Sequence, residues 1–190
     1  MLRRAFAVTF APRREWALIA REQPASLAVF FRHVMPLAAI PAFAWMFGLA
    51  VFGLDLVGPG EPIARPGPAA ILRAGLFTDL GSILSVALLA GAFALVAPMY
   101  GTRRDWRGAW TVAAYGTTPV WLFGVVLVKP LLVVAMVAVL LHCAYVYHDG
   151  LRAMGLARDG DAPEYVAIAV VLLFAASTLV GGVLGILGVL

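Results

Sequence analysis

The sequence predicts an all-α protein, a polytopic membrane bundle of about five transmembrane helices with an N-terminal amphipathic helix at the membrane interface. Composition is the first observation behind this prediction. Of the 190 residues, 63% are hydrophobic and 13% are charged, and the mean hydropathy is +0.97. A soluble domain averages about half apolar and about a quarter charged residues. Because one soluble core cannot hide this much apolar surface, lipid must solvate it.

Long apolar runs that lack Lys, Arg, Asp and Glu locate the spans. Crossing about 30 Å of hydrocarbon takes about 20 helical residues. Five runs have about the required length, at residues 33–54, 80–100, 109–128, 130–147 and 165–190. The third and fourth are separated only by Lys129-Pro130, which predicts a tight helical hairpin. We therefore divide the chain into an N-terminal segment, residues 1–32, and a five-helix transmembrane domain, residues 33–190.

The positively charged residues alternate between the two sides of this bundle. Eleven of the 14 Lys and Arg residues lie before the first span or in the second and fourth loops, and three lie on the opposite side. Positive residues concentrate on the cytoplasmic side, so we expect a multi-pass protein of the cell (inner) membrane, with a cytoplasmic N-terminus and an external C-terminus. The basic residues sit between apolar runs rather than on one soluble face, which argues against a nucleic-acid partner.

Residues 12–32 interleave apolar and charged side chains and are too charged to cross a membrane. We expect an amphipathic helix on the cytoplasmic membrane surface, broken near Pro24. Arg13, Arg14 and Trp16 are the candidate interfacial anchor, with Trp16 at headgroup level. The alternative is a soluble helix that packs under the bundle.

A candidate polar site inside the membrane lies in the third span, at Tyr115, Thr117, Thr118 and Pro119. Pro119 lacks an N–H group and clashes with the carbonyl of Tyr115, which predicts a kink. The threonine hydroxyls can satisfy the backbone groups that the kink frees. Two interpretations stay open: a polar notch that binds an ion, a lipid headgroup or a partner helix, and a purely structural kink.

His142 in the fourth span completes this candidate site. A histidine inside a span is a functional candidate, although a hydrogen bond to a neighbouring helix is the plainer interpretation. His148 lies six residues further on, about 120° around an ideal helix, so the two do not readily share a metal. We expect Asp79 and Glu164 in the first turns of the second and fifth spans, where they complement the helix dipole. The sequence predicts no cofactor and no metal.

Small residues in the fifth span form a packing motif. Gly181 and Gly185 have the small-xxx-small spacing that lets helices approach closely. The motif fits packing inside the bundle or a seam between two copies of the chain.

Four short motifs occur in a fixed order along the chain. They are Pro12 to Glu22 before the first span, Val34 to Ala42 within it, Ala114 to Leu122 in the third span, and a fourth span that ends in tyrosines and Gly150-Leu151. In these motifs and in its five spans the chain resembles the bacterial branch of the Yip family, which is related to eukaryotic Rab-interacting membrane proteins. The long N-terminal domain of eukaryotic members is missing, so Rab binding is not carried over. The resemblance implies a membrane-organising role and no reaction.

The leading functional hypothesis is therefore a non-enzymatic membrane protein that organises membrane or scaffolds partners. Its expected partners are membrane lipids, other membrane proteins or a second copy of itself. The alternative is a small transporter, channel or lipid-translocating protein that uses the notch near Tyr115 to Pro119 and His142. An intramembrane enzyme ranks third, because the spans offer no paired aspartates, serine–histidine pair or metal cluster.

Overall fold

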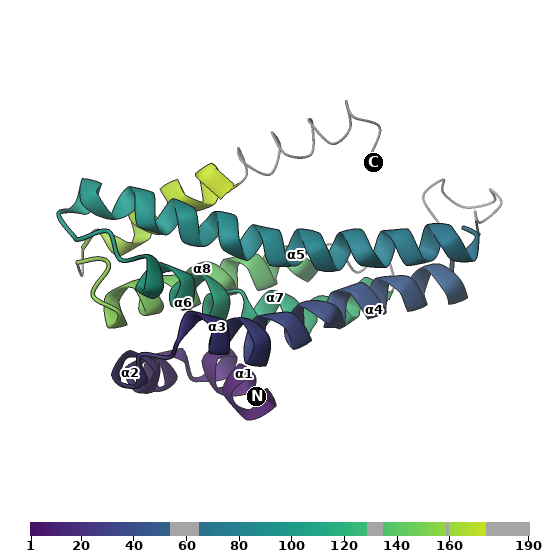
Figure 1. Cartoon of the computed structure of the whole chain (residues 1–190), viewed down its shortest axis with the longest axis horizontal. Helices are drawn as coiled ribbons and strands as arrows, with labels where there is room; N and C mark the ends of the chain where they lie inside the picture. Colours follow the sequence, from purple (N-terminus) through teal and green to yellow (C-terminus); the bar gives the residue numbers. More distant parts are fainter. Residues whose placement is uncertain (54–64, 129–134, 159, 174–190) are drawn as a thin grey trace.

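The computed structural model describes residues 1–53, 65–128, 135–158 and 160–173. Within these ranges every regular element is a helix, and the prediction of an all-α membrane helix bundle is confirmed. Figure 1 shows the long helices running side by side along one axis. Two of them, Ser26–Val51 and Pro68–Tyr100, are long and apolar enough to cross a membrane, and a shorter apolar helix covers Ala162–Leu173.

The labelled helices follow one another along the chain with few breaks. Their bounds are α1 Leu2–Phe10, α2 Pro12–Glu22, α3 Ser26–Val29, the π-helical turn η1 Phe30–Val34, α4 Met35–Val51, α5 Pro68–Val96, the 3₁₀ turn η2 Ala97–Tyr100, α6 Trp106–Gly116, α7 Thr118–Phe123, the 3₁₀ turn η3 Gly124–Val128 and α8 Ala135–Ala153.

The first spanning helix is built from α3, η1 and α4, which follow one another directly along the chain. It begins at Ser26 rather than at His33, so the proposed boundary between residues 1–32 and 33–190 falls inside one helix. At about 1.5 Å per residue it is about 39 Å long, more than the hydrocarbon thickness.

The second spanning helix, α5, begins at Pro68, and proline suits this first helical position. The expectation that Asp79 lies in the first turn of its helix is therefore wrong, because Asp79 lies about three turns inside α5. Gly75 of α5 packs directly against α4: a Cβ atom there would lie 2.1 Å from the sulfur of Met46. The two longest helices thus form a close antiparallel pair. Glu164, by contrast, does lie in the first turn of the helix Ala162–Leu173.

The remaining predicted spans are shorter in the structure. The third is divided into α6, α7 and η3, and Thr117 caps both α6 and α7. The fourth corresponds to α8, which continues past Tyr147 to Ala153. The predicted hairpin at Lys129-Pro130 and the packing residues Gly181 and Gly185 lie outside the described residues.

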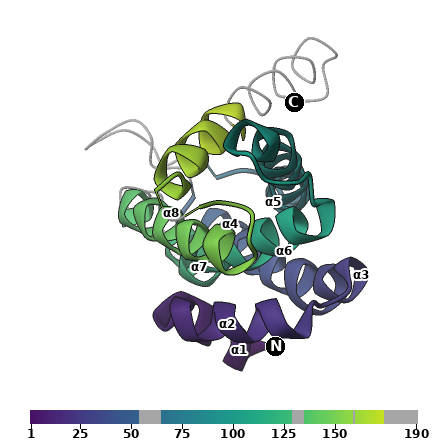
Figure 2. The same cartoon turned by 90° about the vertical axis from the view of Figure 1, so that its left-hand side faces the viewer.

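The N-terminal helices α1 and α2 lie across one side of the bundle. In Figure 1, α2 is seen nearly end-on while α4 and α5 run along the long axis, and Figure 2 shows the pair as a layer beside the bundle. Residues 23–25 break the helix near Pro24, as predicted, and Gln23 takes a left-handed conformation with φ 45°. The guanidinium of Arg107 donates to the carbonyl oxygens of Gln23 and Pro24, which holds this turn against α6.

The buried core includes side chains from the N-terminal pair. Two of the largest fully buried side chains, Trp16 and Ile19, belong to α2. The others at the head of this group are Trp121, Tyr165, Phe93 and Leu37. The outer faces of α4 and α5 expose large apolar side chains, among them Phe43, Phe47 and Leu80. A helix that is buried on one side and apolar on the other suits a lipid surrounding.

Candidate functional site

A π-helical turn interrupts the first spanning helix near its start. Residues Phe30–Val34 form this turn, in which each N–H bonds to the carbonyl five residues back. Such turns are rare in proteins overall, and those that occur are often at functional sites. Here the turn leaves Phe31 and Arg32 exposed while His33 points into the bundle and is buried.

His33 joins the first spanning helix to the broken third one. Its Nε2 lies 2.8 Å from the hydroxyl oxygen of Thr118, and both groups are buried. The imidazole also packs on the ring of Tyr115, with 4.3 Å between ring centroids. A buried imidazole and a buried hydroxyl each need a partner, and here each serves the other.

The hydroxyl of Thr117 has one partner in α6, which it caps, and one in α8. It donates to the carbonyl oxygen of Ala113 at 2.7 Å and lies 2.7 Å from the hydroxyl of Tyr147 in α8, which donates to it. Pro119 occupies the first turn of α7, where its missing N–H costs nothing. The predicted notch residues Tyr115, Thr117 and Thr118 therefore lie together, and each contacts a side chain from another helix.

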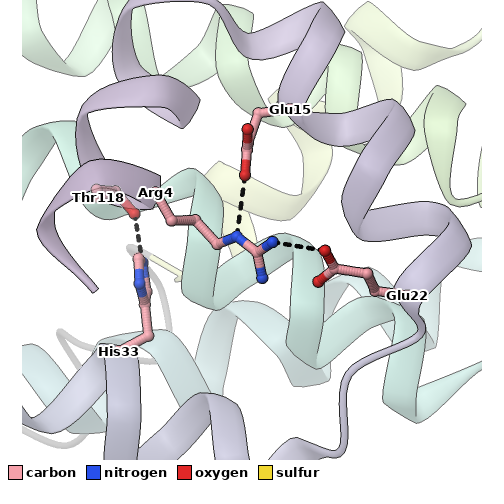
Figure 3. A network of polar contacts seen from close by, with 5 residues as sticks. All are labelled: Arg4, Glu15, Glu22, His33 and Thr118. Carbon is pink, nitrogen blue, oxygen red and sulfur yellow. Dashed lines mark hydrogen bonds and ion pairs between the residues drawn. The ribbon is translucent and has the colours of Figure 1, made fainter.

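Arg4 of α1 forms a second polar cluster beside this one. Figure 3 shows its guanidinium between two carboxylates of α2. Its Nε donates to Glu15 at 2.9 Å and its Nη2 donates to Glu22 at 2.7 Å. The hydrogen bond to Glu22, followed by the contributions of Tyr115 and Glu15, raises the pKa of Arg4 although partial burial opposes it. The same hydrogen bond lowers the pKa of Glu22.

An open cleft of about 640 Å³ lies between α1, the end of α2 and the first spanning helix. Its polar side chains come from four elements, α1, α2, η1 and α6, and most of its apolar wall comes from the start of the first spanning helix. The lining residues are Met1, Arg4, Glu22, Pro24, Ala28, Val29, Phe31, Arg32, His33, Pro36 and Tyr115.

His142 makes its hydrogen bond to the N-terminal helices. Its Nε2 donates to the carbonyl oxygen of Thr9, at the end of α1, over 2.7 Å. A carbonyl can only accept, so this contact places the ring proton on Nε2. His142 therefore has its hydrogen-bond partner in α1, whereas Thr118 bonds a side chain of the first spanning helix and Thr117 bonds a side chain of α8.

Trp16 is buried, in contrast to the expected position at headgroup level. It has 0% exposure, and its indole N–H donates to the carbonyl oxygen of Val146 in α8 at 3.0 Å. Its ring also meets Tyr115 edge to face, with centroids 6.2 Å apart. The apolar face of α2 therefore meets protein, which is the packing that the alternative interpretation described.

The other two candidate anchor residues, Arg13 and Arg14, are exposed. Arg13 lies 3.5 Å from the buried carboxylate of Asp149 in α8. A second hollow of about 310 Å³ lies here, lined by Arg13, Trp16, Asp149, Arg152 and Ala153. Arg13 thus belongs to the α2–α8 contact, and Arg14 faces outward.

Sequence reasoning did not single out His33, Arg4 or Asp149. His33 lies at the edge of an apolar run, and Arg4 and Asp149 lie in short charged segments without a recognisable motif. Only their distant partners reveal their roles. In the part of the chain that the structure describes, no group of three or more His, Cys, Asp or Glu side chains is placed to hold a metal ion.

Comparison with known proteins identifies one family. The family model described as the Yip1 domain matches residues 6–188, which include the second half of α1, all of α2 and the described bundle. No curated protein and no solved structure matches the chain significantly.

Proposed function

The chain belongs to the Yip1 domain family, which confirms the resemblance seen in its sequence, and we propose that it is a non-enzymatic protein that organises membrane or scaffolds partners. The proposal places α1 and α2 on the cytoplasmic side of the cell membrane and the C-terminus outside, in line with the distribution of Lys and Arg. Lipids, other membrane proteins or a second copy of the chain are its expected partners.

One observation carries the proposal: α2 is held with a fixed outward face. Arg14, Ala17, Leu18 and Arg21 are exposed at helical spacing. The opposite face is anchored by buried Trp16, so α2 cannot turn over without losing its packing. A basic stripe with an exposed leucine suits anionic headgroups or an acidic partner surface. The crosswise position of α2 also fits a helix that lies in the membrane plane (Figure 1).

Deleting residues 1–32 would not test this function, because it would remove Trp16 from the core and Ser26 from the first spanning helix. We suggest a photo-crosslinking residue at Leu18, with the lipid-facing Leu76 of α5 as the matched position; both leucines are exposed. The protein would be irradiated in its native membranes. Two forms are compared: the otherwise natural chain, and the chain that also carries Arg14→Glu and Arg21→Glu.

We expect the adducts formed at Leu18 to disappear in the double variant while the adducts at Leu76 persist, because the charge change repels anionic and acidic partners. An unchanged adduct pattern at Leu18 would contradict the proposal.

A second candidate, transport or lipid translocation, is favoured by Asp79. One of its carboxylate oxygens is buried and has no hydrogen-bond partner among the described residues. It lies near Ser82, whose hydroxyl oxygen accepts from the indole N–H of Trp121 at 2.6 Å. A carboxylate inside a spanning helix is a functional candidate. Flux and lipid flip-flop in proteoliposomes, with Asp79→Asn, His142→Ala and Thr118→Val, decide between the two functions.

The scaffold remains the leading proposal because the notch residues are engaged with one another. Thr118 is bonded to His33, Thr117 to Tyr147, and His142 to the backbone at Thr9. Groups that satisfy each other in this way are poorly suited to exchange partners with a passing solute.

A further inference from the structure

The cleft between α1 and the first spanning helix has the size of a ligand site and two kinds of wall. Its volume of about 640 Å³ lies within the range of about 300–1,000 Å³ that is usual for small-molecule sites. Arg4, Arg32 and Tyr115 supply polar groups, while Ala28 and Phe31 supply apolar surface. A ligand with one charged end and one apolar end fits this division.

The uncompensated charge of the cleft is positive. Arg4 is already neutralised by Glu15 and Glu22. Arg32, in contrast, is exposed and makes no hydrogen bond or ion pair to any other residue in the described ranges. Arg107 adds another guanidinium at the rim, where it holds the carbonyl of Pro24. Of the charged side chains that line the cleft, Arg4 and Arg32 are positive and Glu22 is negative, and the one without an ion pair in the described part of the chain is Arg32.

The position of Arg32 along the first spanning helix distinguishes a lipid from a free anion. It is the last charged residue before the apolar run 33–54. Beside it the helix exposes Leu27, Phe31 and Met35, and further along it exposes Phe43. A phospholipid whose phosphate binds Arg32 would have its acyl chains along this apolar face. In a leaflet the acyl chains lie deeper than the phosphate, so this arrangement fits a lipid.

The π turn supports the same conclusion from backbone geometry. Phe31, Arg32 and His33 are consecutive, yet all three line the cleft. Single-turn π segments inside α-helices occur frequently at functional sites. The turn therefore collects a cation, a ring and an imidazole at the point where the apolar run begins.

We propose that this cleft binds the phosphate headgroup of an anionic phospholipid of the cytoplasmic leaflet, with Arg32 as its counter-ion. The proposal deepens the membrane-organising function and rests on it only in placing this end of the bundle in the cytoplasm. The cleft and the α2 stripe use different residues. A negative crosslinking result with the Arg14 and Arg21 variants would therefore overturn the proposed role of the stripe, while lipid binding in the cleft is tested by its own experiment.

The experiment measures lipid binding to the delipidated full chain in detergent by native mass spectrometry. Phosphatidylglycerol is titrated against phosphatidylcholine, with inorganic phosphate as a competitor. Arg32→Gln removes the proposed counter-ion, and Arg73→Gln is the matched control because Arg73 is also exposed but lies on α5. Ala28→Trp fills the cleft without changing any charge. Thermal unfolding of each variant confirms that it is folded.

The natural chain should retain phosphatidylglycerol in preference to phosphatidylcholine. Arg32→Gln should weaken phosphatidylglycerol binding about fivefold, the effect of about one arginine near an anionic surface. Ala28→Trp should weaken it at least as much, and Arg73→Gln should leave it unchanged.

Equal binding of both lipids would overturn the proposal, as would equal losses for Arg32→Gln and Arg73→Gln. Full binding by a folded Ala28→Trp variant would show that the lipid sits elsewhere. Displacement of the lipid by an equal concentration of inorganic phosphate would mark a simple anion site and exclude the lipid assignment.

Discussion

The indole N–H of Trp16 donates a 3.0 Å hydrogen bond to the carbonyl oxygen of Val146, a residue 130 positions later in the chain. Gly150 makes this approach possible, because a Cβ atom there would lie 2.6 Å from the indole ring. The contact fastens the first helices of the chain to α8. It also determines which face of α2 points outward, on which the proposed function depends.

Replacing Trp16 tests how much this contact stabilises the protein. Trp16→Phe removes the hydrogen bond and part of a buried ring, so we expect the free energy of unfolding to fall by about 1–3 kcal/mol. The measurement is equilibrium denaturation in detergent micelles. Trp106→Phe is the control, because Trp106 is 55% exposed and its substitution should change stability by no more than about 0.5 kcal/mol. Similar losses in both variants would contradict the core position of Trp16.

The bond between His33 and Thr118 calls for a double-mutant cycle. Thr118→Val leaves the buried Nε2 of His33 without its partner, which should cost about 1–3 kcal/mol of stability. Combining it with His33→Leu replaces both polar groups by apolar ones, and the double variant should lose less than the sum of the single losses. Strict additivity would mean that the two side chains do not stabilise each other.

Helix content, two long apolar helices and the break near Pro24 followed from local sequence patterns. The burial of Trp16 did not, because an amphipathic pattern shows that one face is apolar but not whether lipid or protein covers it. The π turn has no local sequence signature. The pairing of His33 with Thr118 joins residues 85 positions apart, and no single-sequence pattern carries that information.

The predicted second span begins at residue 80, whereas α5 begins at Pro68. Proline and glycine are dense between residues 58 and 68, and they favour an irregular connection. Proline is also the best first residue of a helix, and Pro68 has this role. Because α5 begins at Pro68, Asp79 lies inside the helix, and its buried carboxylate oxygen is the observation that favours the second candidate function.

The ion pair between Arg4 and Glu22 predicts a pH dependence. Because the hydrogen bond from Arg4 lowers the pKa of Glu22 below its ordinary value of 4.5, the pair contributes stability above that pH. The contribution is lost as the pH falls through the lowered pKa. Glu22 is largely exposed, so the effect should be small.

The comparison that reveals it is the midpoint of thermal unfolding between pH 6 and pH 3, in the natural chain and in Glu22→Gln. The unfolding midpoint of the natural chain should exceed that of Glu22→Gln at pH 6, and this difference should shrink towards pH 3. A difference that does not change with pH would contradict the prediction. Glu15→Gln, which removes the other carboxylate of the cluster, should leave the titration of Glu22 in place.

The orientation in the membrane is testable by labelling from each side. The chain has one cysteine, Cys143, which is buried and can be replaced by alanine. New cysteines at the exposed positions Arg103 and Arg73 should then react differently with a membrane-impermeant maleimide. Position 73 should be labelled in intact cells and position 103 only after permeabilisation. Labelling of position 103 in intact cells would reverse the assignment.

The long separation between Trp16 and Val146 also sets an order of assembly during synthesis. Val146 is 130 positions after Trp16, and at about 5–20 residues per second its synthesis follows about 7–26 s later. Throughout that interval the inner face of α2, with Trp16 and Ile19, has no α8 to pack against. A nascent chain stalled before α8 should therefore have a protease-sensitive N-terminus. Protection of α1 and α2 from protease should begin only after the ribosome has translated α8.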